Sequence, residues 1–317
     1  MLTNLVRQAI RPIWRPARRV MVRVVREETS PVLQMRSSLC RERDFSAPWF
    51  QKWSALINQA VPPLSQEEAA VWGLAWACLN GHGMHRKIWE WNAICQALDE
   101  RGMLRPGRRG IGFAVGTEPL SSLFAERGVE LVSSDFQGED ADATWSATGQ
   151  LGDSLKNIHW ERVLPFERFQ SLVEYRNVDM RDLGPVPKGE FDFSWSSCAF
   201  EHLGSLEAGL QFLESSLDCL KPGGIAVHTT EYNVSSNEAT IETGQSVIYR
   251  RQDIERFAAR IRAKGCAIEA LDLEPGWDQH DIAYDMPPYY KHGRQHVKLQ
   301  LDGFVTTSLL LIIRKGA

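Results

Sequence analysis

The hydrophobic pattern of the chain changes its period repeatedly between residues 109 and 315. Apolar stretches of strand length alternate there with amphipathic stretches of helical period. Seven stretches are predicted as strands, at 109–114, 129–134, 172–180, 191–197, 223–232, 267–274 and 306–315. Helices are predicted between them at 119–127, 206–220 and 250–265. This alternation is typical of an α/β protein with an open, largely parallel sheet and helices on both faces.

The first hundred residues show mainly helical patterns. A helix over 85–102 stops at Gly102, and a short basic linker leads from it into the first predicted strand. We therefore divide the chain into a basic amphipathic arm at 1–28, a helical extension at 29–84 and an α/β domain at 85–317. The domain contains two long insertions, at about 136–168 and 275–303. Connections of that length in a compact domain are often lids or substrate sites.

The arm at residues 1–28 has two faces. It carries seven arginines and no acidic residue before Glu27. At helical spacing the apolar residues fall on one side and most arginines on the other, a pattern typical of segments that lie on an anionic membrane surface. Pro12 and Pro16 disfavour one continuous helix. Three interpretations stay open: an arm docked on its own domain or on another subunit, peripheral membrane contact, and a cleaved targeting peptide.

The composition is that of an ordinary globular protein. The 317 residues are 43% hydrophobic and have a formal net charge of −4, which gives no sign of a nucleic-acid partner. The six cysteines are scattered without a C-x-x-C pair, as expected of reduced thiols in the cytoplasm. No apolar run approaches the ~20 residues of a membrane-spanning helix. We therefore expect a cytoplasmic protein, with association at the inner membrane face as the alternative that the arm leaves open.

The turn after the first predicted strand has an unusual glycine spacing. Gly110, Gly112 and Gly116 read G-x-G-x-x-x-G, whereas a dinucleotide site favours G-x-G-x-x-G, which brings the backbone close to a pyrophosphate. Glu118, in the same turn, would repel that pyrophosphate. Asp135 ends the second predicted strand, at a distance from the turn that suits a carboxylate accepting two ribose hydroxyls. A phosphate-free nucleoside with a positive centre fits this turn, and S-adenosylmethionine is such a ligand.

Two later segments support this ligand. In "RNVDMRDL", Asp179 follows the third strand, where it can bind an adenine amino group while Val178 and Met180 pack on the ring. The segments "FDFSWSSCAFEHLGS" and "LKPGGIAVHTTEYN" come after it. Taken together, residues 85–317, and most specifically 108–233, resemble the class I S-adenosylmethionine-dependent methyltransferases. Within these, "GFAVGTEPL", "TGQ" and "TTEYN" are most similar to bacterial methyltransferases associated with carbohydrate and surface-glycan synthesis.

The resemblance implies a Rossmann-like, doubly wound sheet of seven strands, mostly parallel, with the last strand antiparallel. It also implies S-adenosylmethionine as the methyl donor and S-adenosylhomocysteine as the product. The turn departs from the family's acid–x–G–x–G–x–G run, because Gly112 stands at the acidic position, so Glu118 is expected to supply that carboxylate. The residues predicted to hold the donor are Ala114, Gly116, Glu118, Asp135, Val178, Asp179, Met180 and Ser197.

A hydroxyl acceptor benefits from a general base, and two candidates follow the fourth and fifth strands. His202 ranks first and Glu231 second, with a loop-holding role as the other interpretation of His202. A divalent metal in the second insertion, through His292 and His296, is the less favoured interpretation of that segment. The residues predicted to contact the acceptor are Trp145, Gln150, Tyr232, Asn233, Asp281 and Tyr289.

These observations predict an S-adenosylmethionine-dependent methyltransferase that O-methylates a sugar hydroxyl of a glycan or glycan precursor. A methyltransferase acting on a non-sugar small molecule is the first alternative. An NAD-dependent oxidoreductase and a non-catalytic, membrane-associated assembly module are the others. The glycine spacing and Glu118 disfavour the oxidoreductase, and the ribose and adenine acids disfavour the assembly module.

Overall fold

The structure of the chain is a computed structural model that describes residues 33–61, 75, 77–137, 151–290 and 293–316. The arm at 1–28, His292 and the predicted acceptor residues Trp145 and Gln150 lie outside these residues. From Met35 onward the chain forms one compact unit. Within the described part of the chain, no helix is both long and apolar enough to cross a membrane.

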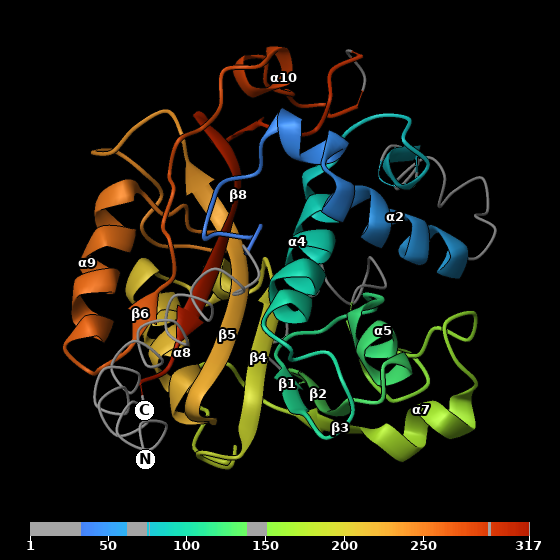
Figure 1. Cartoon of the computed structure of the whole chain (residues 1–317). Coiled ribbons are helices and arrows are strands. Elements are labelled where there is room, and N and C mark those ends of the chain that lie inside the picture. Colours follow the sequence, from blue (N-terminus) through green and yellow to red (C-terminus); the bar gives the residue numbers. More distant parts are fainter. Residues whose placement is uncertain (1–32, 62–74, 76, 138–150, 291–292, 317) are drawn as a thin grey trace, which may run out of the picture. The chain divides into compact units, whose positions relative to one another are not determined.

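The centre of this unit is an eight-stranded sheet in the order β3-β2-β1-β4-β5-β8-β6, with β7 paired to β8 (Figure 1). β1 to β5 are joined in parallel, whereas β8 runs antiparallel to β5, β6 and β7. The predicted Rossmann-like, mostly parallel sheet with an antiparallel last strand is confirmed. The strands are β1 (Arg109–Gly112), β2 (Glu130–Asp135), β3 (Val173–Asn177), β4 (Phe191–Ser197), β5 (Leu220–Asn233), β6 (Ala267–Ile268), β7 (Leu299–Leu301) and β8 (Phe304–Arg314).

The sheet has eight strands rather than the seven predicted, because β7 adds a hairpin to β8. The two central residues of the hairpin, Asp302 and Gly303, have φ angles of 46° and 88°. Positive φ at both positions matches the twist of antiparallel strands, and Asp-Gly is a preferred sequence for it. The signal for this strand is therefore the turn sequence and not the hydrophobic period.

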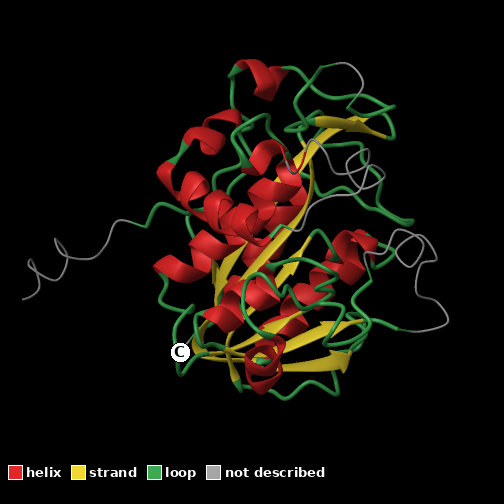
Figure 2. Ribbon diagram, turned by 90° about the vertical axis from the view of Figure 1, so that its right-hand side faces the viewer, coloured by secondary structure: helices red, strands yellow, loops and turns green. Residues whose placement is uncertain are grey.

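Helices cover both faces of the sheet, as predicted (Figures 1 and 2). One face packs against α2 (Pro48–Ala60), α4 (Arg86–Glu100), α5 (Leu120–Glu126) and α7 (Phe166–Leu172), and the other against α8 (Leu206–Asp218) and α9 (Arg251–Arg262). The connections contain the short helices η1 (Glu42–Ser46), η2 (Phe200–His202) and α10 (Gln279–Ile282). Each face has its own hydrophobic core, with Trp53 and Trp89 in the first and Phe200 and Phe212 in the second.

β5 divides its side chains between these two faces. Thr229 donates to Glu90 of α4, and Glu231 accepts from Arg86 of the same helix. Tyr232 belongs instead to the core under α8 and α9. Successive side chains of a strand point to opposite faces. The predicted base Glu231 and the predicted acceptor residue Tyr232 therefore lie on opposite faces of the sheet.

Candidate active site

The turn after β1 is closed by Asp135 at the end of β2. The N–H groups of Gly116 and Gly152 donate to Asp135 Oδ2 over 3.1 and 2.9 Å, and that of Phe136 donates to Oδ1 over 2.9 Å. Ala114 and Gly116 have φ angles of 46° and 52°, in the left-handed region that allows the sharp turn. The turn, Asp135 and the first insertion thus form one hydrogen-bonded unit at the carboxyl edge of the sheet.

Asp135 has capacity for one more hydrogen bond. It is 7% exposed, and burial raises the pKa of its carboxyl group against the effect of the three backbone N–H groups. A carboxylate offers about four lone-pair sites, so three donors leave one open. Asp135 therefore stays the residue predicted to bind the ribose.

The predicted adenine residues lie directly beside Asp135. Val178 N–H donates to the Asp135 carbonyl over 3.0 Å, and both Val178 and Met180 are buried. The Asp179 carboxylate pairs with Arg181 over 2.8 Å. Burial alone would raise the pKa of Asp179, but the hydrogen bonds from Arg181 outweigh it and hold the pKa below its usual value. An adenine at this position competes with Arg181 for the carboxylate.

A buried group of charges lies where α4 packs on β4, β5 and β8. We call it the α4 charge cluster; its members are Arg86, Lys87, Glu90, Glu118 and Glu231. Glu90, at 0% exposure, is its centre. Burial alone would raise the pKa of Glu90, but Lys87 and Arg86 outweigh it and hold the pKa below its usual value. Hydrogen bonds to Glu90 come from Ser197, Cys198, Thr229 and Ser308.

Glu118 joins the turn after β1 to this cluster. Lys87 Nζ lies 3.6 Å from Glu118 Oε1 and donates to Ser197 Oγ over 3.3 Å. Burial raises the pKa of Glu118 to about 7, although Lys87 lowers it. The predicted donor residues Glu118 and Ser197 are thus brought together by Lys87, which the sequence did not single out.

The two predicted bases differ in their surroundings. Glu231 is 4% exposed, and one of its oxygens accepts from the Arg86 guanidinium. His202 lies in η2, where its Nδ1 donates to the Gln245 carbonyl over 2.7 Å. That bond fits the loop-holding role, because it ties η2 to the connection that precedes α9.

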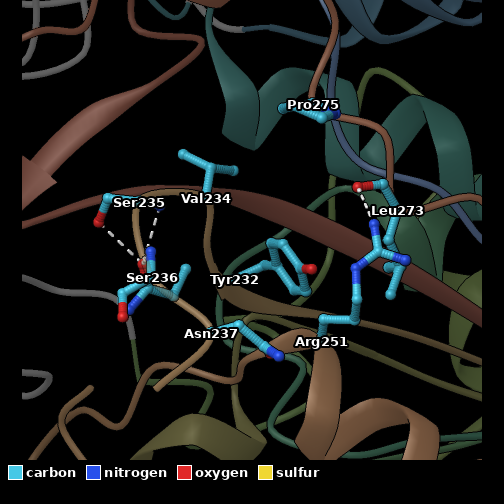
Figure 3. A pocket seen from close by; sticks show the side chains of 9 residues that line it. Tyr232, Val234, Ser235, Ser236, Asn237, Arg251, Leu273 and Pro275 are labelled. Atoms are coloured by element: carbon cyan, nitrogen blue, oxygen red, sulfur yellow. Dashed lines mark hydrogen bonds between the residues drawn. The ribbon is translucent and has the colours of Figure 1, made fainter. Parts of the chain in front are cut away.

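Tyr232 and Asn233 line a cavity of about 200 Å³ on the α9 side of the sheet (Figure 3). Asn233 Oδ1 accepts from the N–H groups of Ser235 and Ser236 over 3.0 and 2.9 Å, so this side chain shapes the loop after β5. Arg251 supplies the charge of the cavity wall, and its Nη2 donates to the Leu273 carbonyl over 3.4 Å. Because Glu231 points to the other face, the cavity and the α4 charge cluster are separate.

A buried ion pair holds the second insertion against η1. Asp281 Oδ1 lies 3.0 Å from Lys298 Nζ, and both side chains are 0% exposed. Lys298 also donates to the Cys40 carbonyl over 2.6 Å, and Glu42 N–H donates to Asp281 over 3.0 Å. The carboxylate of Asp281, predicted to contact the acceptor, is therefore engaged inside the protein.

The rest of the insertion exposes aromatic side chains. Trp277 is 77% exposed and Tyr290 is 42% exposed, whereas most large hydrophobic side chains of the described residues are buried. Tyr289, a predicted acceptor residue, lies next to Tyr290, and its hydroxyl donates to the Gln300 carbonyl over 2.6 Å. The insertion thus exposes the aromatic rings of Trp277 and Tyr290, and we call these its aromatic surface.

An aspartate–histidine pair lies under this surface. His296 Nδ1 donates to Asp285 Oδ2 over 2.9 Å, and Asp285 is fully buried. Among the described residues, His296 Nε2 has no hydrogen-bond partner. Burial lowers the pKa of His296 to about 4, with Arg86 acting in the same direction and Asp285 against it. At neutral pH the imidazole is therefore uncharged, with its proton on Nδ1 and a lone pair at Nε2.

This pair is joined to the α4 charge cluster. The His296 carbonyl accepts from Arg86 N–H over 2.9 Å, and the His296 ring packs against those of His85 and Tyr290, with both centroid distances at 4.8 Å. His85 is the N-cap of α4. No local spacing signals the pair, because a separation of eleven residues through an irregular segment implies no shared face.

The sequence of the domain matches a known family. Residues 112–228 match the family model described as a methyltransferase domain, a span that contains the turn, Asp135 and Asp179. The match confirms the predicted enzyme class and, with it, S-adenosylmethionine as the methyl donor. Comparison with curated proteins finds no match.

Several solved structures are similar to the chain. Phosphoethanolamine N-methyltransferase 2 of Haemonchus contortus, in complex with S-adenosyl-L-methionine, is 19% identical, with a TM-score of 0.37 over 54% of this chain and 36% of that one. A putative S-adenosylmethionine-dependent methyltransferase of Listeria monocytogenes is 13% identical, with a TM-score of 0.42 over 73% and 98%. A putative methyltransferase of Bacillus halodurans is 14% identical, with a TM-score of 0.43 over 71% and 99%. With TM-scores below 0.5, none of these likenesses bears on the acceptor.

The described residues fit this donor. Its methionine end carries an ammonium and a carboxylate, and Lys87 and Glu118 offer the opposite charges 3.6 Å apart. Asp135 keeps its spare acceptor capacity beside the buried Val178 and Met180.

Proposed function

We propose that the protein transfers a methyl group from S-adenosylmethionine to a hydroxyl of a sugar, glycan or glycan precursor. The observation that carries the proposal is the Asp285–His296 pair. A hydroxyl must lose its proton as its oxygen attacks a methyl group, and a neutral imidazole oriented by a buried carboxylate can accept that proton. His296 Nε2 takes the proton, while Nδ1–H keeps its hydrogen bond to Asp285, which acts against the lowering of the pKa by burial.

The roles of the earlier base candidates follow from their contacts. Glu231 Oε1 is bound to the Arg86 guanidinium, so this oxygen is already occupied by a donor. His202 supports the connection before α9 through Gln245. We therefore rank His296 above His202 and Glu231 as the general base.

On the donor side, each part of S-adenosylmethionine is bound by different residues. S-adenosylmethionine supplies an electrophilic methyl group on a sulfonium. Asp135 accepts from a ribose hydroxyl, and Asp179 contacts the adenine between Val178 and Met180. Lys87 pairs with the methionine carboxylate and Glu118 with its ammonium. Positioning of the two reactants accounts for most of the acceleration in such a transfer.

The sugar acceptor is supported by the exposed aromatic surface of the second insertion. Trp277 and Tyr290 are exposed there, and aromatic rings of this kind bind the apolar faces of sugars while their polar tips reach hydroxyls. A non-sugar alcohol would use the same base. The glycan-associated subtype is therefore the finer part of the proposal, and the hydroxyl acceptor is the coarser part.

The test is product identification by mass spectrometry. The protein is incubated with methyl-deuterated S-adenosylmethionine and a panel of free sugars, nucleotide-activated sugars, non-sugar alcohols and amines. A labelled methyl group on a sugar oxygen, lost in His296→Asn, supports the proposal. Transfer to an amine nitrogen only would overturn the hydroxyl acceptor. Transfer to non-sugar alcohols only would overturn the sugar and leave the base assignment in place.

A further inference from the structure

Three potential metal ligands meet at the carboxyl ends of β4 and β5. Cys198 follows β4, Glu201 lies in η2 and Glu231 is near the end of β5. The Cys198 sulfur and one oxygen of each glutamate lie within 4.8 Å of one another. Carboxyl ends of adjacent parallel strands meet at one edge of a sheet, which explains how residues 33 positions apart share this space.

Two oxygens of this group lack partners. Glu201 is 1% exposed and Glu231 is 4% exposed. Glu201 Oε2 accepts from Thr230 Oγ1 over 3.1 Å, and Glu231 Oε1 accepts from Arg86. Glu201 Oε1 and Glu231 Oε2 have no hydrogen-bond partner among the described residues. Buried polar atoms are nearly always paired, so two unpaired acceptors in one small space point to a bound donor or cation.

The charges at this place favour a cation. Arg86 is bound to Glu231 and Glu90 and its Nη1 lies 3.9 Å from the Cys198 sulfur, while Lys87 is held by Glu90 and Glu118. The three candidate ligands, together with Glu90 and Glu118, outnumber these two cationic side chains, so a cation bound among them would meet an excess of acidic groups.

We propose that Cys198 Sγ, Glu201 Oε1 and Glu231 Oε2 form a site for a divalent cation, with zinc as the cation that they suit. Zinc accepts thiolate and carboxylate ligands together, whereas magnesium and calcium prefer oxygen alone. Three protein ligands leave the fourth position of a tetrahedral site open. Cys198 has a φ of 45°, a conformation that non-glycine residues adopt rarely and mostly at functional sites. The site is independent of the proposed sugar acceptor.

Metal binding is measured without donor or acceptor. Full-length protein is stripped with a chelator, dialysed and titrated with zinc against a chromophoric competitor, and the bound metal is counted by mass spectrometry. We expect one zinc per chain. Cobalt(II), used as a second probe, should give a thiolate-to-metal charge-transfer band. Cys198→Ser should abolish that band and weaken zinc binding by at least about tenfold, and Glu201→Gln should weaken zinc binding similarly.

The control is Cys219→Ser, which removes a buried thiol at the C-cap of α8, outside the site. This variant should bind zinc as the wild type does. Wild-type protein that binds no stoichiometric zinc, or cobalt without a thiolate band, would overturn the proposal. Equal zinc affinity in Cys198→Ser and the wild type would also overturn it. Because the wild-type cobalt spectrum is decisive by itself, a variant that folds poorly does not leave the question open.

Discussion

The two halves of the carboxyl edge of the sheet are built differently. In the β1–β3 half, Asp135 binds the backbone of Gly116 and Gly152, which are 19 and 17 residues away. In the β4–β8 half, Glu90 binds Ser197, Thr229 and Ser308, which are 107, 139 and 218 residues away. The β1–β3 half, where the donor is predicted to bind and which we call the donor half, is thus a local structure. The β4–β8 half is assembled from distant segments by α4.

The difference indicates where acceptor chemistry can vary. The donor half contains one βαβ unit and its loops, and its geometry follows from that unit. The β4–β8 half depends on α4 and the second insertion, which are additions to the sheet and do not touch Asp135 through any hydrogen bond among the described residues. A change in the second insertion should therefore alter catalysis or stability while leaving donor binding intact, and a change in the β1–β3 half should weaken donor binding.

The largest effect is expected from the base. His296→Asn should lower kcat by about 10²- to 10⁴-fold, because proton transfer no longer has a positioned acceptor. Its pKa of about 4 keeps the imidazole neutral at all higher pH values, so the loss should be the same from about pH 6 to pH 8. Donor affinity, measured by calorimetry, should not change. His280→Asn, in the same insertion, is the control. Equal kcat for the two variants would remove His296 from the mechanism.

The next effect concerns stability. Lys298→Met leaves Asp281 buried without its cation and should lower the free energy of unfolding by about 3–5 kcal/mol. Adding Asp281→Leu should restore much of the loss, because the unpaired charge is then gone. The comparison variant is Lys264→Met, whose exposed ion pair with Glu214 is expected to contribute less than about 1 kcal/mol. Chemical denaturation measures all three. A loss in Lys298→Met no greater than in Lys264→Met would contradict the anchoring role.

The contrast between local and long-range contacts also decides which features can be predicted from the sequence. Period and turn residues predict the strands of the sheet and the place of Asp135, because these depend on neighbours within one βαβ unit. Alternation along β5 also separates Glu231 from Tyr232, although their shared motif suggests one site. Asp281 is different, since its partner Lys298 and its contact with η1 exist only after distant segments have packed.

Lys87 and Glu90 show the same limit. They lie on a helix whose pattern indicates only an amphipathic surface, and nothing near them in sequence marks a ligand. Their contacts depend on α4 packing over the ends of β4, β5 and β8, which no spacing encodes. The additional strand β7 is the contrary example, because the Asp-Gly turn that joins it to β8 is a purely local signal.

A third effect belongs to the donor half. Asp135→Ala should weaken S-adenosylhomocysteine binding by about 100-fold, since a hydrogen bond to a charged group contributes about 1.5–3 kcal/mol. The kcat at saturating donor should fall much less than in His296→Asn. Asp182→Asn removes an exposed acid that binds Gly184 after β3, and it should leave the affinity unchanged. Unaltered calorimetric affinity in Asp135→Ala would contradict the ribose role.

The smallest effect tests whether Glu118 belongs to the donor half although it contacts the α4 charge cluster. With a pKa of about 7, the carboxyl group is mostly protonated below neutral pH, and pairing with an ammonium requires the ionised form. Donor affinity should therefore rise by roughly eightfold from about pH 6 to about pH 7.5, as the group loses its proton. Glu118→Gln should lose this dependence and bind the donor at about pH 7.5 several-fold more weakly. Calorimetry with S-adenosylhomocysteine at both pH values measures it. A pH dependence that persists in Glu118→Gln assigns the titration to another group and leaves Glu118 as a partner of Lys87 alone.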